Sequence, residues 1–360
     1  MFWFNYADAQ TSIAIYGIAD ANVEYATNMS SVVPNAANGF RTGPGHSVAR
    51  ANSGGQSGSR WGLRGVENLG NGLRALIVLE GGFGIDTGSM QQGGRLFGRQ
   101  AYVGMAAEKM GSITFGRQYT AIFDSFANFS PQGYAAQYDP LWLQLGLNAR
   151  SDNTMKYVGK FSGFTAAAHW SLGNGVAGNG EIPGQFRRDK GYGAAVRYTS
   201  GLFGVALVYD QYNPTLNATT GATGSNRKAG AAASYVVGPA KIMGGYRWGK
   251  NEGAASQTIS RDDYYWVGVN YQISPITLTL AYYYDDWKNF NGANPKNPWQ
   301  ISFAANYVFS KRTDLYLTTA FARNAGLALD TQLINNVNGY YLGSDKTSMV
   351  GVALGIRHRF

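Results

Sequence analysis

The last stretch of the chain alternates strictly between two kinds of side chain. Every second position carries an apolar, aromatic or histidine side chain: Val350, Val352, Leu354, Ile356, His358 and Phe360. The positions between them hold glycine, alanine or arginine. Successive side chains of a strand point to opposite faces, so this strand has one apolar face and one small or charged face. Such a strand is typical of a wall between lipid and water, and it predicts a transmembrane β-barrel. We expect the terminal Phe360 to lie where this strand closes against the first one.

Composition favours a single barrel over helical spans or several soluble domains. The 360 residues include 49 glycines and 24 tyrosines but no cysteine. The chain has no run of about 18 apolar residues, which a transmembrane helix requires. Tyrosine suits the membrane interface, where its ring lies in hydrocarbon and its hydroxyl in water. The mean hydropathy of −0.23 is compatible with this interpretation, because barrel walls are apolar only at alternate positions.

The chain has a formal charge of +9, from 30 Lys and Arg against 21 Asp and Glu. A basic soluble protein would suggest a nucleic-acid partner. However, no basic run exceeds two residues, and no nucleic-acid-binding motif is present. The excess is scattered along the alternating segments, so we expect a positively lined interior and no nucleic-acid partner.

Alternating segments recur along the whole chain, and their connections alternate in length. About sixteen strands are predicted, at 11–28, 57–67, 72–84, 96–107, 111–118, 153–160, 164–172, 190–199, 203–212, 227–237, 240–250, 262–273, 276–287, 297–308, 313–324 and 347–360. Tight turns alternate with long polar connections at 29–56, 85–95, 119–152, 173–189, 213–226, 251–261, 288–296 and 325–346. Short turns at one end and long loops at the other are typical of an outer-membrane barrel. A soluble β-sandwich, the alternative all-β fold, has no reason to sort its loops in this way.

The first residues differ from the rest of the chain. Residues 1–9 end in Ala7-Asp8-Ala9, which has the small-x-small form of a signal-peptidase site. We expect residues 1–9 to be a leader remnant or a periplasmic N-terminal extension, and residues 10–360 to form one barrel.

Several motifs stand out along the chain, namely Ile15-Tyr16-Gly17 with Asp20, and the segments 58–70, 72–75, 96–104, 111–118 and 355–360. Together they resemble the general porins of Gram-negative bacteria, in their β-proteobacterial branch. The resemblance implies a sixteen-stranded, homotrimeric porin of the outer membrane that passes small hydrophilic solutes by diffusion. It also implies contact with outer-membrane lipid and lipopolysaccharide.

In such porins the third long loop folds into the barrel and narrows it. Here that loop is Tyr119–Asp152, which is unusually aromatic and contains two acids, Asp124 and Asp139, before Asp152. A long loop rich in residues of the buried type is expected to pack inside the barrel. Two roles for its rings remain open. They attach the loop to the wall, or some of them line the constriction and favour aromatic or amphipathic solutes.

The opposite wall is predicted to carry positive charge. Strand alternation places Arg60, Arg64, Arg99, Arg150 and Lys156 on lumen faces of neighbouring strands. The resemblance to anion-selective porins implies that Arg60, Arg99 and Arg150 form the constriction cluster and that Glu80 holds it in place. Guanidinium groups around a narrow pore attract anions and repel cations, and arginine remains charged throughout. We therefore predict a mild to moderate anion preference. The alternative is a porin that prefers organic or aromatic carboxylates.

Other inward arginines are expected to serve structure. Arg197, Arg247, Arg357 and Arg359 point inward by alternation, and the candidate acidic partners are Asp20, Asp152, Asp210 and Asp285. Related porins use an arginine at the position of Arg117 to receive a neighbour's second loop, which makes Arg117 a candidate trimer contact.

Catalytic chemistry has no support in the sequence. The histidines His46, His169 and His358 are far apart and lack metal-ligand spacing, and cysteine is absent. No nucleophile elbow of the Gly-x-Ser-x-Gly type occurs either. We expect no enzyme activity, metal or cofactor. A structural barrel with a plugged pore remains the third possibility.

Overall fold

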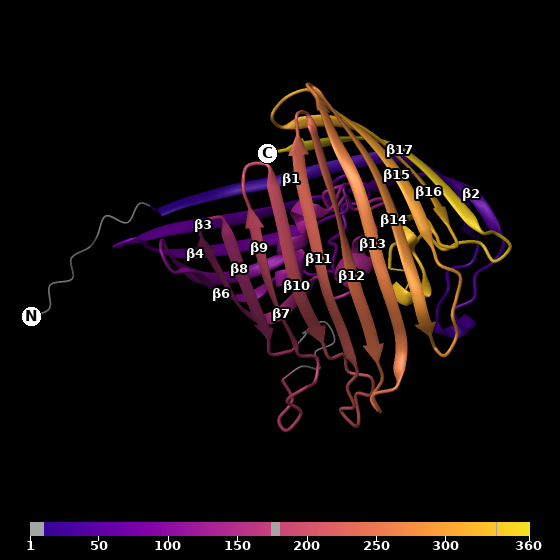
Figure 1. The fold of residues 1–360 in the computed structure, drawn as a ribbon, viewed down its shortest axis with the longest axis horizontal. Coiled ribbons are helices and arrows are strands. Elements are labelled where there is room, and N and C mark those ends of the chain that lie inside the picture. The colour runs from indigo at the N-terminus through magenta and orange to yellow at the C-terminus, as the bar shows by residue number, and fades with distance from the viewer. Residues whose placement is uncertain (1–10, 174–180, 336) are drawn as a thin grey trace, which may run out of the picture.

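A closed antiparallel sheet forms the wall of the molecule (Figure 1). The computed structural model describes residues 11–173, 181–335 and 337–360, so the prediction for residues 1–9 lies outside the described residues. The first strand, β1 (Thr11–Ser30), pairs with the last, β17 (Ser348–Arg359), in the register Ile18↔Arg359 to Ala26↔Gly351. This pairing closes the barrel.

The wall has sixteen strands in the part of the chain that the structure describes, because two segments share one position. Both β2 (Gly45–Ser53) and β3 (Arg60–Gly70) pair with β1, along its second and first halves respectively. The other strands follow in chain order: β4 (Leu73–Gly82), β5 (Gln100–Ala107), β6 (Gly111–Tyr119), β7 (Arg150–Phe161), β8 (Phe164–Ser171), β9 (Gly191–Thr199), β10 (Phe203–Tyr212), β11 (Ser225–Val237), β12 (Ala240–Glu252), β13 (Thr258–Ile273), β14 (Ile276–Phe290), β15 (Trp299–Val308) and β16 (Thr313–Arg323). The predicted sixteen-stranded barrel is confirmed.

The prediction of a long loop at 29–56 is wrong in part, because residues 45–53 form β2. The break between β2 and β3 has a specific cause. The fully buried carboxylate of Asp20 accepts hydrogen bonds from the backbone amides of Gly55, Gln56 and Ser57, at 3.0, 3.0 and 2.7 Å. Those amides point inward to Asp20 and are not part of the sheet ladder. The alternation of apolar and polar side chains is therefore interrupted between β2 and β3, and the sequence pattern there is typical of a loop.

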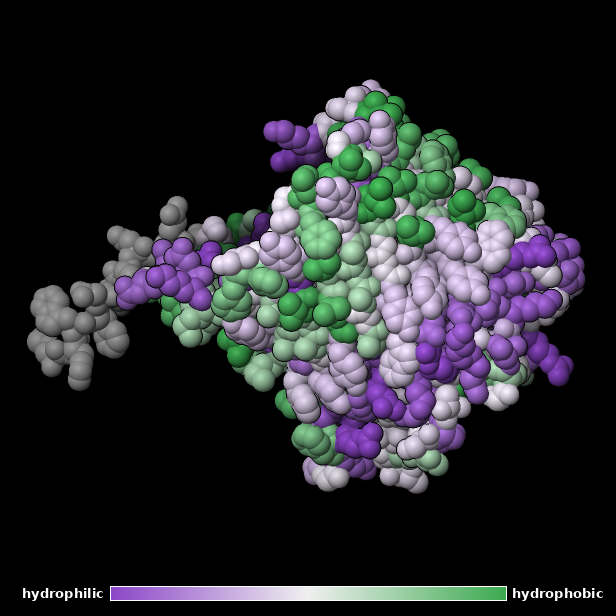
Figure 2. Space-filling model, viewed as in Figure 1, coloured by the Kyte–Doolittle hydropathy of each residue, from purple (hydrophilic) through white to green (hydrophobic). Residues whose placement is uncertain are grey.

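The two faces of the wall differ as the alternation predicts. Ile13 and Ile15 of β1 are 73% and 71% exposed, whereas Asp20 and Glu24 of the same strand are buried. Figure 2 shows hydrophobic side chains over much of the wall and hydrophilic ones towards the long loops. The apolar side chains thus face outward and the polar ones face the interior, the reverse of a soluble barrel.

The third loop lies inside the wall. It contains α1 (Ala121–Phe126), a 3-10 turn η2 (Ala127–Phe129) and α2 (Leu141–Leu145). α1 contacts β8, β9 and β10, and η2 contacts β11 and β12. The wall makes room for the loop with small inward residues, namely Ala167, Ala195, Ala206 and Ala232.

Short 3-10 turns occur in the other long loops, at η1 (Ala36–Asn38), η4 (Leu327–Leu329) and η5 (Gln332–Ile334). Among the described residues, no helix has the length and apolar character needed to span a membrane.

The barrel closure depends on a glycine opposite the last residue. The amides and carbonyls of Gly17 and Phe360 exchange hydrogen bonds of 3.0 and 3.1 Å. A Cβ atom at Gly17 would lie 2.2 Å from the Phe360 ring.

We expect Gly17→Val to destabilise the barrel by about 1–3 kcal/mol, because the new side chain overpacks the closure. The measurement is resistance to unfolding by heat in detergent. The control is Gly201→Val, since an added Cβ there meets no atom within 4 Å. Equal resistance of the two variants would contradict this account of the closure.

Candidate functional site

Arginines from neighbouring strands meet around one tyrosine. Arg99, which precedes β5, is 6% exposed and donates from Nε to Glu80 Oε1 at 2.8 Å. Its Nη2 donates to the Tyr119 hydroxyl at 2.7 Å, and Nη2 of Arg150 donates to the same oxygen at 3.2 Å. The Arg150 guanidinium also lies over the Tyr119 ring, 4.7 Å from its centroid. Tyr119 therefore fixes two guanidiniums at the root of the third loop.

A second tyrosine supports the cluster from β1. The Tyr16 hydroxyl donates to Glu80 Oε2 at 3.0 Å, and the Arg64 guanidinium lies 5.7 Å from the Tyr16 ring centroid. The sequence singled out Tyr16 only as part of a motif, and it gave Tyr119 no role beyond the first position of the third loop. Its position could have indicated a role, because Tyr119 directly follows the motif 111–118, where the chain leaves the wall for the interior.

The cluster carries excess positive charge. Glu80 balances Arg99, but Arg60, Arg64 and Arg150 have no carboxylate within ion-pair distance in the described chain. Arg60 is held by a hydrogen bond from its Nε to the Gly58 carbonyl at 2.9 Å, and it interacts with the like charges of Arg99 and Arg150 and with the opposite charge of Glu80. Four guanidiniums and one carboxylate therefore leave an excess of three positive charges on the inner wall.

The predicted lysine of the site has a structural partner. Lys156 is 8% exposed, and its Nζ donates to Asp124 Oδ2 at 2.7 Å and to the Tyr119 carbonyl at 2.8 Å. Asp124 belongs to α1, so this ion pair attaches the third loop to β7. The charges of Lys156 and Asp124 cancel locally, and the pair leaves the arginines as the excess charge of the site.

The second predicted acid of the third loop does not face the pore. Asp139 is 3% exposed and accepts hydrogen bonds from Ser130 Oγ at 2.7 Å and from the Tyr134 amide at 3.1 Å. It lies inside the fold of the loop because its carboxylate joins residues 130–134 to residue 139. The placement of Asp139 at the constriction was wrong for this reason.

The aromatic residues of the third loop divide into two groups. Phe126 and Phe129 are fully buried against the wall, and the Trp266 indole donates from Nε1 to the Phe129 carbonyl at 2.8 Å. Phe123 and Tyr134 are partly exposed instead. The ring of Phe123 stacks on Tyr119 at 3.8 Å, and Tyr134 follows at 4.9 Å. The first group attaches the loop to the wall. The second group, together with Tyr119, forms a row of aromatic rings next to the Arg150 guanidinium.

Most other inward arginines are paired, but with acids other than those predicted. Arg247 pairs with Asp262, and Arg357 pairs with Asp314 at 2.5 Å. Arg359 also reaches Asp314, at 3.4 Å. Arg197 donates to the Asp124 carbonyl at 3.3 Å and has no carboxylate partner among the described residues. Asp314 and Arg357 lie directly opposite each other on β16 and β17, so this pair follows from the strand register.

Comparison with known proteins decides which family this barrel belongs to. Residues 5–327 match the Gram-negative porin family. The chain is a Gram-negative porin. An outer membrane porin of Bordetella pertussis is 30% identical over 98% of this porin and 96% of its own length. Among solved structures, the anion-selective porin of Comamonas acidovorans has a TM-score of 0.76 and 25% identity, over 98% of this porin and 100% of that chain. The trimer form of an outer membrane protein of Vibrio cholerae has a TM-score of 0.68 at 16% identity, over 97% and 99% of the two chains. This porin is therefore a channel protein of the outer membrane.

Arg117 of this porin is engaged within its own chain. Its Nη1 donates to Asp152 Oδ1 at 2.5 Å, and its Nε donates to the Gly98 carbonyl at 2.7 Å. Asp152 also accepts from Arg95 of the second loop at 2.9 Å. One acid thus holds two arginines, and this cluster fixes the second loop to the root of the third.

The docking of the third loop in this porin is expected to depend on pH through Asp139. Burial raises the pKa of Asp139 to about 7, and the hydrogen bonds from Ser130 and Tyr134 only partly offset it. A raised carboxyl pKa contributes stability at low pH that is lost as pH rises through about 7. Hydrogen-exchange protection of residues 120–149 should therefore fall from acidic to mildly alkaline pH. In Asp139→Asn, which keeps an acceptor oxygen, protection should be nearly constant. An unchanged pH dependence in that variant would contradict the role of Asp139.

Proposed function

We propose that this porin forms a water-filled channel for passive diffusion of small hydrophilic solutes, with a mild to moderate preference for anions. The observation that carries the proposal is the group of uncompensated guanidiniums, Arg60, Arg64 and Arg150, beside the third loop. A low-dielectric wall strengthens their attraction for anions, and a planar guanidinium binds carboxylate or phosphate with two donors. The similarity to the anion-selective porin of Comamonas acidovorans supports the same reading. We also propose that the protein acts as a channel only and has no enzyme activity.

The test is the rate at which liposomes containing the purified protein swell in solutes of equal size and different charge. Anionic solutes should enter faster than neutral ones, and neutral ones faster than cationic ones. Equal rates for all three would contradict the anion preference. Absence of swelling with every solute would instead favour a plugged barrel.

A second candidate function is a preference for aromatic carboxylates. The stacked rings of Tyr119 and Phe123 next to the Arg150 guanidinium favour it, because they offer an apolar surface beside a cation. Benzoate should then reduce the chloride current at a lower concentration than acetate, and benzyl alcohol should have little effect. Equal potency of benzoate and acetate would leave only charge as the basis of selection.

We also propose that the porin assembles as a homotrimer in contact with outer-membrane lipid and lipopolysaccharide, with Arg117 near the subunit contact. The trimer form of the similar Vibrio cholerae protein supports this assembly. A monomer in native mass spectrometry from mild detergent would contradict it.

A further inference from the structure

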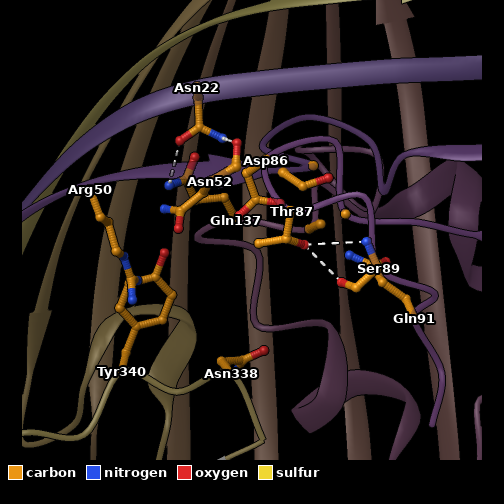
Figure 3. A pocket seen from close by; sticks show the side chains of 14 residues that line it. Asn22, Arg50, Asn52, Asp86, Thr87, Ser89, Gln91, Gln137, Asn338 and Tyr340 are labelled. Atoms are coloured by element: carbon orange, nitrogen blue, oxygen red, sulfur yellow. Dashed lines mark hydrogen bonds between the residues drawn. The ribbon is translucent and has the colours of Figure 1, made fainter. Parts of the chain in front are cut away.

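A second polar site lies apart from the arginine cluster. It is a pocket of about 380 Å³ between the inner faces of β1 and β2, the second loop, the third loop and the last long loop (Figure 3). Its lining includes Asn22, Asn52, Gln91, Gln137 and Asn338. None of Arg60, Arg64 and Arg150 lines it. Its volume is within the roughly 300–1,000 Å³ of small-molecule sites.

Two amide groups of the pocket have unused hydrogen-bonding capacity. Gln137 is 5% exposed, and its Nε2 donates to Asn22 Oδ1 at 3.4 Å while its Oε1 has no hydrogen-bond partner. Nδ2 of Asn338 is also buried and has no partner among the residues that the structure describes. Buried polar atoms are nearly always hydrogen-bonded, so an acceptor and a donor that are both unpaired point to a ligand.

The charges around the pocket do not favour a simple anion. Its only arginine, Arg50, donates from Nε to Glu24 at 2.6 Å, and this buried carboxylate compensates its charge. Asp86 adds a negative charge at the rim. The pocket thus lacks the excess positive charge of the constriction, and we expect it to offer no electrostatic attraction to anionic solutes.

Groups that both donate and accept dominate the lining. Beside the amides, the hydroxyls of Thr87 and Ser89 lie 2.7 Å apart and face the same space (Figure 3). Hydroxyls of a polyol also act as donors and acceptors, so each can pair with an amide or another hydroxyl. We propose that this pocket binds a neutral polyhydroxylated solute of monosaccharide size.

The site would concentrate neutral solutes that the arginine cluster does not attract. A solute held between the long loops and the third loop has a higher local concentration next to the constriction. This role rests on the proposed channel function, but the binding itself does not require conduction.

The experiment uses D-glucose as the probe and the full-length wild-type channel. Glucose should reduce the open-channel current with saturation. Asp86→Ala/Gln91→Ala/Asn338→Ala should raise the half-blocking concentration at least about tenfold, because each side chain offers one or more hydrogen bonds. These three side chains make no hydrogen bond within the described chain, so the fold should be retained. The matched control is Asn294→Ala, in an exposed loop outside the pocket.

Binding is measured in parallel by saturation-transfer NMR of glucose with the detergent-solubilised protein. Saturation transfer in the wild type and its loss in the triple variant would support the site even if no current flowed, in which case only the channel function would fail. A linear decrease of current with glucose, identical in wild type and triple variant and without saturation transfer, would overturn the proposal. Stronger block by zwitterionic glycine than by glucose would overturn the choice of a polyol.

Discussion

Replacing Arg60 and Arg150 together by glutamine is expected to remove most of the anion preference of this porin. Both guanidiniums lie on the inner wall, and neither has a carboxylate within ion-pair distance among the described residues, so their charge remains available to a permeating anion. Two unit charges 4 Å apart interact by about 1 kcal/mol in bulk water and more in a confined site. The two substitutions together should then lower the chloride-to-potassium permeability ratio by roughly fivefold, which corresponds to about 1 kcal/mol. Conductance should rise because the side chains are shorter.

The measurement is the reversal potential of single channels under a KCl gradient. The matched control is Arg323→Gln, an exposed arginine at the end of β16 with the same parity as outward-facing Leu317 and Phe321. It should leave the permeability ratio unchanged. If the double variant kept the wild-type ratio, the selective charge would have to lie elsewhere, for example at Arg64 or Arg197.

The second large effect is expected from Glu24→Ala, which removes one anchor of the third loop. The buried Glu24 carboxylate accepts from the hydroxyls of Tyr138 and Tyr340 at 2.7 and 2.6 Å, and from Arg50 Nε at 2.6 Å. Tyr138 belongs to the third loop and Tyr340 to the last long loop, so one carboxylate joins both to β1. Removing it leaves a cation, two hydroxyls and the Asn52 amide without this acceptor. The change should cost about 3 kcal/mol, the low end for a buried ion pair, because Arg50 keeps partial contact with water.

The consequence should appear in the current as well as in stability. Once the third loop is released near Tyr138, it should fluctuate in the lumen, and we expect noisier and larger single-channel currents with a lower unfolding temperature. Tyr340→Phe is the control, because it removes one hydroxyl and leaves the ion pair with Arg50. Quiet currents of wild-type size from Glu24→Ala would show that other contacts, such as Trp266 with Phe129, suffice to hold the loop.

The wall was predictable from the sequence because one physical rule governs it. Alternation predicts one apolar and one polar face for each strand. In β1, Ile13 and Ile15 on one face are exposed, and Asp20 and Glu24 on the other face are buried. The same parity placed Arg60 on the inner face. Where the rule is interrupted, prediction failed. The strand β2 was missed because the amides after it bind Asp20, a contact between residues 35 to 37 positions apart.

The details of the site were harder to predict because they depend on long-range contacts. The sequence indicated the arginine cluster but not Tyr119, whose hydroxyl joins Arg99 and Arg150 only after the third loop has turned inward. The burial of Asp139 depends on how the loop folds on itself, which strand periodicity does not determine. Likewise, the choice of Asp314 as the partner of Arg357 follows from the register of β16 and β17.

The most direct test of the central claim is the zero-current potential of the purified porin in a planar bilayer under a KCl gradient. The uncompensated guanidiniums predict a potential of anion-selective sign. A potential of cation-selective sign would contradict the account, because it would mean that acids such as Glu80 and Asp124 dominate the constriction.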